Sequence, residues 1–480
     1  MTTDTSNNWH KFYINGTWTE PKGTATLEII NPATETACAT VALGDAKDID
    51  AAVRAAYRAF PTFSRTSKAD RVALLERVLS SYIHHAEAMA QAVTAEMGAP
   101  LAFSRGDQVA GGRAHLETTI EFLKKFEFEI QRGKTQIFHE PVGVAGLITP
   151  WNWPLVQIVC KVAPALGAGC TVVLKPSELA PLSALVFAQV MHDADLPPGV
   201  FNLVNGDGPG AGEALARNPL VDMVSFTGST RGGIAVAKTA ADTVKRVSQE
   251  LGGKSANILL DDADFATAVR IGIKKCFDNS GQSCDAPTRM LVPEAALPRV
   301  RALAKEAAAA YVVGDPLSPS TVLGPLANKS QFHKVQRLIQ AGISEGAEVL
   351  TGGIGRPDGL THGYYVRPTI FSGVTPAMTV AREEIFGPVL SILTYRSEEE
   401  AIEIANDTPY GLAGRVQSGD INRARAVASR LRAGTININY SAWDITAPFG
   451  GFKQSGNGRE YADFGIKEFV EIKAVVGYRT

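Results

Sequence analysis

The chain has 480 residues, of which 45% are hydrophobic and 20% are charged, a composition typical of folded globular proteins. Its 47 Lys and Arg residues nearly balance its 49 Asp and Glu residues, which leaves a formal net charge of −2. This balance excludes the basic field that binds nucleic acid or an anionic membrane. At about 150 residues per domain, the length predicts two or three domains.

The first 125 residues are expected to be mainly helical after a short β start. Residues 1–11 are polar and lack the basic and apolar regions of a signal peptide, so we expect no secretion by that route. Apolar residues then recur at helical spacing over 48–60 and 69–97. This periodicity predicts helices with one buried face.

A hairpin is predicted next. Residues 126–130 and 135–139 alternate between apolar and polar side chains around a glycine-containing turn at 131–134, a pattern typical of antiparallel strands. The uncharged run 141–160 is long enough to span a membrane. Pro150, Pro154 and Asn152 are incompatible with a lipid-exposed helix, however. We therefore expect a buried strand and loop there, and no membrane partner.

Short apolar runs alternate with helical segments from residue 143 onward. They lie at 144–148, 171–174, 201–204 and 223–226, and in a second series at 289–292, 389–394 and 435–438. Continuous apolar strands separated by helices are the signature of parallel sheets with helices on their faces. The sequence therefore predicts an α/β fold that closes on an alternating strand at 468–476.

Five cysteines are spread along the chain without a CxxC pair or a histidine at metal-ligand spacing: Cys38, Cys160, Cys170, Cys276 and Cys284. An odd number of widely spaced cysteines indicates neither a disulfide framework nor a zinc site. The pattern fits a reducing compartment, so we expect a cytoplasmic protein without a structural metal.

Two segments have the form of nucleotide-binding turns. The strand at 223–226 runs through a Gly and Ser turn into a helix, which would present backbone N–H groups to a phosphate. The strand at 171–174 leads to Lys175 and Glu178, and a carboxylate there can bind both hydroxyls of a ribose. An ordinary turn explains the first segment equally well, and a solvated loop explains the second slightly better. Residues 206–211 match the dinucleotide fingerprint only loosely.

Three side chains are candidates for catalysis. Cys284 lies in a polar, turn-forming segment, which predicts an accessible thiol that a cation or dipole could activate. Glu250 precedes two glycines that would let the backbone approach closely, and its carboxylate could face a pocket. Asn152, between two tryptophans and two prolines, presents an amide that can stabilise an oxyanion or merely tie its loop down. An inert cysteine and a solvated glutamate are the commoner roles for the first two.

Taken together, these segments resemble the aldehyde dehydrogenase superfamily over nearly the whole chain. The resemblance rests on motifs that occur in the family's order: 150–154, 175–178, 226–230, 250–254, 281–284, 383–388, 409–412, and 448–453 with 455–460.

The resemblance implies NAD-dependent oxidation of an aldehyde to a carboxylic acid. The Cys284 thiolate would attack the aldehyde, and the Asn152 amide would stabilise the oxyanion together with the Cys284 N–H. After hydride transfer, Glu250 would activate the water that hydrolyses the thioester. Lys161 and Glu460 match positions behind this site, where they would support proton exit or form a structural ion pair.

The resemblance also implies two sets of binding residues. The set for NAD, with NADP bound more weakly because Glu178 would repel a 2′-phosphate, comprises Ile148, Thr149, Pro150, Trp151, Lys175, Ser177, Glu178, Gly208, Phe226, Gly228, Ser229, Leu251, Gly252, Glu384 and Phe386. The set for the substrate tunnel comprises Trp153, Gln157, Cys160, Asp278, Ser283, Asp285, Trp443 and Phe449. No arginine occurs at the tunnel positions, which disfavours a short substrate that carries a carboxylate.

The implied fold is a Rossmann-like cofactor domain (1–125 and 141–252), an α/β catalytic domain (253–452) and a β-hairpin oligomerisation element (126–140 and 468–480). We therefore expect a homodimer or a homotetramer built as a dimer of dimers. Two alternatives remain: a CoA-acylating enzyme, which would not need Glu250, and a catalytically inactive member, which would most simply lack Cys284, Glu250 or Asn152.

Overall fold

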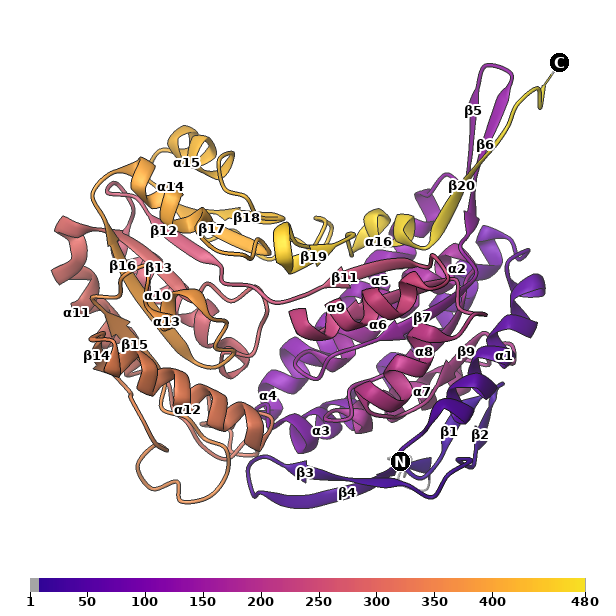
Figure 1. The fold of residues 1–480 in the computed structure, drawn as a ribbon, viewed down its shortest axis with the longest axis horizontal. Coiled ribbons are helices and arrows are strands. Elements are labelled where there is room, and N and C mark those ends of the chain that lie inside the picture. The colour runs from indigo at the N-terminus through magenta and orange to yellow at the C-terminus, as the bar shows by residue number, and fades with distance from the viewer. Residues whose placement is uncertain (1–7, 480) are drawn as a thin grey trace.

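The computed structural model describes residues 8–479. Two α/β lobes each contain one largely parallel sheet, and a three-stranded arm projects from the first lobe (Figure 1). The predicted α/β class is confirmed. No helix in the described residues is long and apolar enough to cross a membrane, and the run 141–160 forms a buried strand, a loop and the start of a helix, α6 (Pro154–Ala168).

The first sheet has the strand order β19-β11-β10-β7-β8-β9-β1-β2. Its five central strands are parallel, and every residue of β7, β8 and β10 is buried, as expected of strands covered on both faces. The bounds are β1 Phe12–Ile14, β2 Thr17–Thr19, β7 Val144–Ile148, β8 Thr171–Lys175, β9 Phe201–Leu203, β10 Met223–Thr227, β11 Arg246–Glu250 and β19 Gly456–Asn457.

Helices cover this sheet, and a separate hairpin flanks it. The helix expected over 69–97 is divided at His85, where the chain leaves helical geometry and the ring contacts Asp193 at 2.7 Å. The elements are β3 Thr26–Asn31, β4 Thr36–Ala42, α1 Ala46–Phe63, α2 Lys68–His84, α3 Ala86–Met97, α4 Leu101–Phe103, α5 Ala110–Lys125, α6, α7 Pro181–Asp193, α8 Glu213–Arg217, α9 Thr230–Ala241, α16 Ala462–Glu468, and π-helical turns at Ser104–Val109 and Gly208–Gly212.

The second sheet has the order β14-β15-β16-β13-β12-β17-β18, in which β14 alone is antiparallel to its neighbour. Its strands are β12 Ala256–Leu259, β13 Arg289–Pro293, β14 Glu348–Thr351, β15 Thr369–Ser372, β16 Val389–Tyr395, β17 Ala413–Gln417 and β18 Thr435–Ile438. Its helices are α10 Phe265–Phe277, α11 Leu297–Ala308, α12 Lys329–Ser344, α13 Thr379–Arg382, α14 Glu398–Asn406 and α15 Ile421–Ala428, with short 3-10 turns at Asp278–Gly281, Glu294–Ala296 and Lys453–Ser455.

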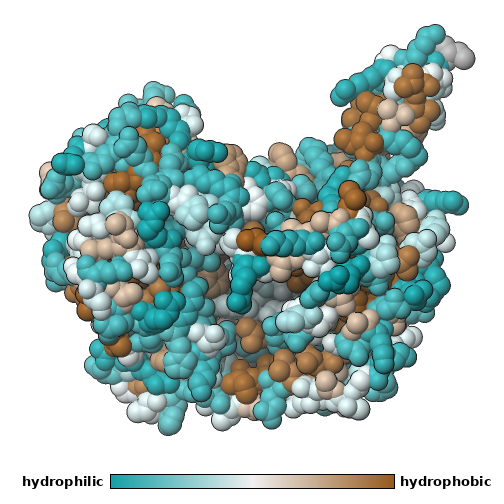
Figure 2. Space-filling model, viewed as in Figure 1, coloured by the Kyte–Doolittle hydropathy of each residue, from teal (hydrophilic) through white to brown (hydrophobic). Residues whose placement is uncertain are grey.

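The projecting arm consists of β5 (Glu129–Arg132), β6 (Thr135–Pro141) and β20 (Val470–Val475), with β6 in the middle. The predicted strand boundaries were wrong at both ends. Phe126 caps α5 and packs on Phe128 instead of starting a strand, and Glu468 still belongs to α16. Apolar side chains lie exposed along the arm (Figure 2), and Ile472 is 71% exposed.

Candidate active site

A cleft of about 180 Å³ lies where residues of the two lobes meet. It brings together many of the residues that the sequence singled out, from segments spread between residues 150 and 386. Its lining comprises Pro150, Trp151, Asn152, Thr227, Gly228, Ser229, Glu250, Leu251, Gly252, Cys284, Gln331, Lys334, Glu384 and Phe386.

The first wall of the cleft is built from the ends of two parallel strands. Thr227 ends β10 and stands beside Glu250, the last residue of β11. The Glu250 side chain is 2% exposed, and neither of its oxygens accepts a hydrogen bond from a described residue. Burial and, secondarily, nearby Glu460 raise the pKa of this carboxyl well above its usual value, against the smaller opposing effect of Lys161.

The second wall is the loop that carries Cys284, and many hydrogen bonds hold it in place. Asn279 adopts left-handed backbone geometry (φ 57°) and donates from Nδ2 to the carbonyl of Asn152 at 2.8 Å. In return, Asn152 Nδ2 donates to the carbonyl of Gln282 at 3.0 Å. The predicted oxyanion amide is therefore fixed directly against the cysteine loop.

Gly253 explains how this loop can approach the first wall. A side chain at Gly253 would overlap the carbonyl oxygen of Cys284, so the residue has to be glycine for the backbones to meet. Gly253 therefore serves close backbone approach, as expected from the sequence, whereas Gly252 makes room for the Glu384 carboxylate.

The Cys284 thiol is less accessible than its polar sequence context predicts. Its residue is only partly exposed, and it packs beside a small cluster of buried side chains that includes Cys160 and Phe449. Burial raises the pKa of the thiol well above its usual value, and Asp285, Glu250 and Glu384 raise it further. The residue nevertheless lines the cleft and keeps intermediate exposure, which agrees in part with the expected accessible thiol.

The mouth of the cleft is formed by the segment that contains Glu384 and Phe386. Glu384 accepts a hydrogen bond from the N–H of Gly253 at 2.9 Å, and burial raises the pKa of its carboxyl. Phe386 has the left-handed φ of 62° and stands edge-on to Trp151 at 5.4 Å between ring centroids. Gln331 stabilises this strained turn by donating to the Phe386 carbonyl at 2.6 Å.

A buried charged cluster lies behind Glu250. Lys161 forms a close ion pair with Glu460 and donates to Ser225 Oγ at 3.0 Å. Cys160, predicted as a tunnel residue, donates from Sγ to Glu460 Oε2 at 3.3 Å. Its thiol is therefore committed to this cluster, although Cys160 also packs against Phe449.

The other predicted cofactor residues lie outside the lining of the cleft, toward the carboxyl ends of β7, β8, β9 and β10 in the first sheet. Lys175 Nζ lies 3.2 Å from Glu178 Oε2, and Ser177 Oγ accepts from the N–H of Leu179. The ring of Phe226 packs against Gly228 and Gly232, at the turn where α9 begins. The predicted residues outside the cleft lining are Ile148, Thr149, Lys175, Ser177, Glu178, Gly208 and Phe226.

Several predicted tunnel residues make hydrogen bonds, ion pairs or ring contacts with neighbouring side chains. Trp153 Nε1 donates to Ser283 Oγ at 2.9 Å, and Gln157 is buried. Asp278 pairs with Lys274 at 2.8 Å. Trp443 remains 45% exposed and lies 5.9 Å from the ring of Phe449.

Sequence reasoning missed several side chains at this site. Tyr461 stacks on Phe449 with centroids 5.1 Å apart, and His115 lies 4.2 Å from Tyr461. Arg415 approaches Asp285 to 3.8 Å, although we expected no arginine at the tunnel positions. An arginine inside a short strand of small and apolar residues was the available signal. Gln331 and Lys334 offered none, because they lie on an ordinary amphipathic helix.

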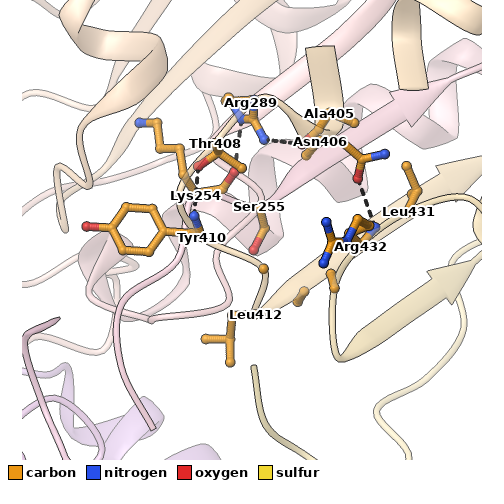
Figure 3. A pocket seen from close by; sticks show the side chains of 15 residues that line it. Lys254, Ser255, Arg289, Ala405, Asn406, Thr408, Tyr410, Leu412, Leu431 and Arg432 are labelled. Carbon is orange, nitrogen blue, oxygen red and sulfur yellow. Dashed lines mark hydrogen bonds between the residues drawn. The ribbon is translucent and has the colours of Figure 1, made fainter. Parts of the chain in front are cut away.

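A second cavity, under β12 and β17, has room for about one water molecule, with a volume of about 20 Å³ (Figure 3). Arg289 crosses it and donates to the carbonyl oxygens of Lys254, Ile404 and Ala405. These bonds fix the segment that follows Gly253, so this cavity belongs to the framework of the site.

Comparisons with known proteins agree with the geometry. The family model described as "Aldehyde dehydrogenase family" matches residues 18–475. A 3-succinoylsemialdehyde-pyridine dehydrogenase of Pseudomonas sp is 55% identical over 98% of this chain and 99% of its own length.

Two solved structures share this fold. A cysteine-to-alanine variant of aldehyde dehydrogenase C from Pseudomonas syringae, complexed with NAD+ and octanal, is 54% identical, with a TM-score of 0.98 and 98% of each chain covered. Betaine aldehyde dehydrogenase of Staphylococcus aureus, in complex with NAD+, is 33% identical, with a TM-score of 0.95 over 100% of this chain and 98% of that one. The chain belongs to the aldehyde dehydrogenase family.

Proposed function

We propose that this protein oxidises an aldehyde to a carboxylic acid with NAD and hydrolyses the intermediate with water. The observation that carries the proposal is the meeting of the Cys284 thiol and the unpartnered Glu250 carboxylate in the lining of one cleft. A buried carboxylate without hydrogen-bond partners is costly. Such a group is expected where a water or substrate completes its bonding.

Cys284 is the proposed nucleophile. Its thiolate attacks the aldehyde carbonyl, and the resulting oxyanion takes hydrogen bonds from Asn152 Nδ2 and the Cys284 N–H. Asn152 already donates one amide hydrogen to Gln282, which leaves the second amide hydrogen for the oxyanion. The Cys284 loop thus holds the nucleophile and aims the oxyanion donor.

Glu250 is the proposed base for deacylation. Once ionised, its carboxylate removes a proton from a water that attacks the thioester, which releases the carboxylic acid and restores the thiol. Lys161 and Glu460 stand directly behind it as an ion pair, and we propose that they support proton exit. A CoA-acylating enzyme would not need Glu250, and an inactive family member would not need to retain Cys284, Glu250 and Asn152 together.

The residues present fit NAD. Thr149 Oγ1 and Thr227 Oγ1 are buried at the carboxyl ends of β7 and β10, and neither has a hydrogen-bond partner among residues 8–479. Polar groups of a dinucleotide would satisfy them. Gly228 and Ser229 would hold the pyrophosphate at the start of α9, and Lys175 and Glu178 the adenosine ribose. NAD, when bound, accepts the hydride.

The nicotinamide half would be held by Glu384 and Phe386. The remaining proposed cofactor residues are Ile148, Pro150, Trp151, Ser177, Gly208, Phe226, Leu251 and Gly252. The NAD+ bound to the two related structures supports this assignment.

We propose a long or aromatic aldehyde as substrate. One relative is named for a pyridine semialdehyde and another was solved with octanal. Phe449, Tyr461 and Trp443 place three rings near the nucleophile, which favours an extended apolar or flat group over acetaldehyde. The proposed contacts are Trp153, Gln157, Cys160, Asp278, Ser283, Asp285, Trp443 and Phe449.

We further propose a homodimer or homotetramer, assembled through the arm. The exposed apolar side chains of β20 and the unpaired outer edges of β5 and β20 support this. The domain division at 1–125 with 141–252, 253–452, and 126–140 with 468–480 is likewise a proposal, supported by the two sheets and the arm. Five cysteines without disulfides in the described residues support a reducing, cytoplasmic location.

A screen for NADH formation tests the activity. Octanal, benzaldehyde, pyridine carbaldehydes and acetaldehyde would each be incubated with enzyme and NAD, and the acid product identified by mass spectrometry. We expect the long and aromatic aldehydes to be oxidised with higher kcat/KM than acetaldehyde. No NADH from any of them, with folded protein, would contradict the proposal.

A further inference from the structure

A buried arginine lies next to the loop that carries the nucleophile. Arg415 is in the middle of β17, which pairs with β12 and β18, and it is 9% exposed. Its neighbours in the strand are Gly414 and Val416. Removing a guanidinium from water is unfavourable unless a partner compensates it, so this arginine requires an explanation.

The partner is the residue that follows the nucleophile. Arg415 Nη2 lies 3.8 Å from Asp285 Oδ2, and no other carboxylate of the described chain lies within 4.0 Å of this guanidinium. Arg415 Nε has no hydrogen-bond partner there. Asp278, the next acid along the loop, is instead held by Lys274. Asp285 is therefore the main acidic partner of Arg415, and Asp278 contributes a weaker attraction.

Negative groups dominate the surroundings of the Cys284 sulfur. Asp285 comes from its own loop, Glu250 from β11 and Glu384 from the segment after α13, and each disfavours the thiolate. Lys161 is already paired with Glu460. Arg415 is thus the buried cation placed to oppose the carboxylate next to the thiol. The titratable and charged groups around the thiol and this pair are Asp285, Glu250, Glu384, Cys160, Tyr461, Glu460, Lys161, Lys334, Lys254, Arg459, Arg415, Asp278 and Lys274.

We propose that Arg415 is a positioning residue that acts on Cys284 through Asp285. It holds the Asp285 carboxylate toward β17 and offsets its charge, so that the Cys284 thiol ionises more readily. The inference rests on the proposed role of Cys284 as nucleophile and adds a residue that determines its reactivity. It involves no contact between Arg415 and the reacting atoms.

The test measures thiol ionisation directly. Cys284 in the NAD-free enzyme would be alkylated with iodoacetamide across a pH series, and the modified peptide quantified by mass spectrometry. Arg415→Gln should raise the apparent thiol pKa and slow alkylation at pH 8 about 3- to 10-fold. Arg415→Lys should restore part of the rate. Asp285→Asn should shift the pKa in the opposite direction.

A double variant separates an effect through Asp285 from a direct one. With Asp285→Asn already present, adding Arg415→Gln should change the alkylation rate much less than it does in the wild type. Equal effects in the two backgrounds would overturn the proposal, as would an unchanged thiol pKa in a folded Arg415→Gln protein. If Arg415→Gln does not fold, Asp285→Asn alone decides, because an unchanged pKa in that variant overturns the proposal.

The matched control is Arg423→Gln, which removes the same charge from a guanidinium paired with Asp261 and Glu398. It should leave the alkylation profile of Cys284 unchanged, and a shift as large as that of Arg415→Gln would overturn the proposal. Failure of the proposed function is recognised separately: Cys284→Ala would then still oxidise aldehydes, whereas the alkylation profile concerns Arg415 alone.

Discussion

Two buried carboxylates of the first lobe differ in what surrounds them. Glu96 on α3 is 1% exposed and accepts hydrogen bonds from the N–H groups of Leu182 at 2.6 Å and Ser183 at 3.1 Å, in the first turn of α7. Glu250 at the end of β11 is equally buried and accepts none from the described residues. Burial raises the pKa of both carboxyls.

The contrast shows that burial alone does not mark a functional carboxylate. Glu96 satisfies the free N–H groups at the start of a helix, which is a structural role. Glu250 faces a cleft shared with a thiol and has its bonding capacity unused, which is typical of catalytic groups. The unused capacity, and not the raised pKa, distinguishes the two sites.

The largest effect on turnover is expected from removing the Cys284 thiol, which forms the thioester that Glu250 is proposed to hydrolyse. Cys284→Ala should lower turnover by about 10³-fold or more, because no thioester forms for a water to attack. NAD affinity, measured by fluorescence titration, should stay the same, since the thiol is not a proposed ligand of the ribose or the phosphates. Full oxidation by this variant would remove Cys284 from the mechanism.

Replacing Glu250 tests whether this carboxylate, unlike that of Glu96, has a catalytic role. Glu250→Gln should slow turnover by about 10²-fold or more, chiefly at deacylation, while a stoichiometric burst of NADH survives in stopped flow. Because burial raises the pKa of Glu250, wild-type kcat should increase as the pH rises through that pKa, and the variant should lack this limb. Unchanged steady-state turnover would assign Glu250 a structural role like that of Glu96.

A third glutamate, the half-exposed Glu178, extends the comparison to the choice between NAD and NADP. Glu178 next to Lys175 would bind both ribose hydroxyls but repel a 2′-phosphate. Wild-type kcat/KM should favour NAD over NADP, and Glu178→Ser should narrow that ratio by about tenfold. Glu213→Ser, which disrupts an exposed pair with Arg217, is the control. An unchanged ratio in Glu178→Ser would show that another residue sets the preference.

The smallest effect on turnover is expected at Glu96. Burial raises the pKa of this carboxyl from 4.5 to about 7, so its protonated form stabilises the fold. That contribution is complete below pH 4.5 and is lost as the pH rises through about 7, roughly 3 kcal/mol at most.

Urea unfolding at several pH values measures this contribution. The free energy of unfolding of Glu96→Gln should fall less than that of the wild type between pH 4.5 and 8, with kcat nearly unchanged. A large loss of kcat in a stable variant would contradict the assignment of Glu96 as structural.

The sequence by itself predicted β7, β8, β9 and β10 of the first sheet, β13, β16 and β18 of the second, and the main catalytic candidates. The apolar run at 144–148 is β7 to the residue, because a strand buried on both faces needs an uninterrupted apolar sequence. Cys284, Glu250 and Asn152 stood out because their short motifs are local. The strand boundaries of the arm were predicted less well. The alternation of apolar and polar side chains continues into the cap of α5 and into α16.

Only the tertiary structure decided which environment each candidate has. The segment around Cys284 is polar, yet Tyr461, Phe449 and Gly253 from distant parts of the chain close around it. The approach of Arg415 to Asp285 joins residues 130 positions apart. The free energies of desolvation and charge pairing depend on distances through space, and these are set when two separately patterned sheets pack together.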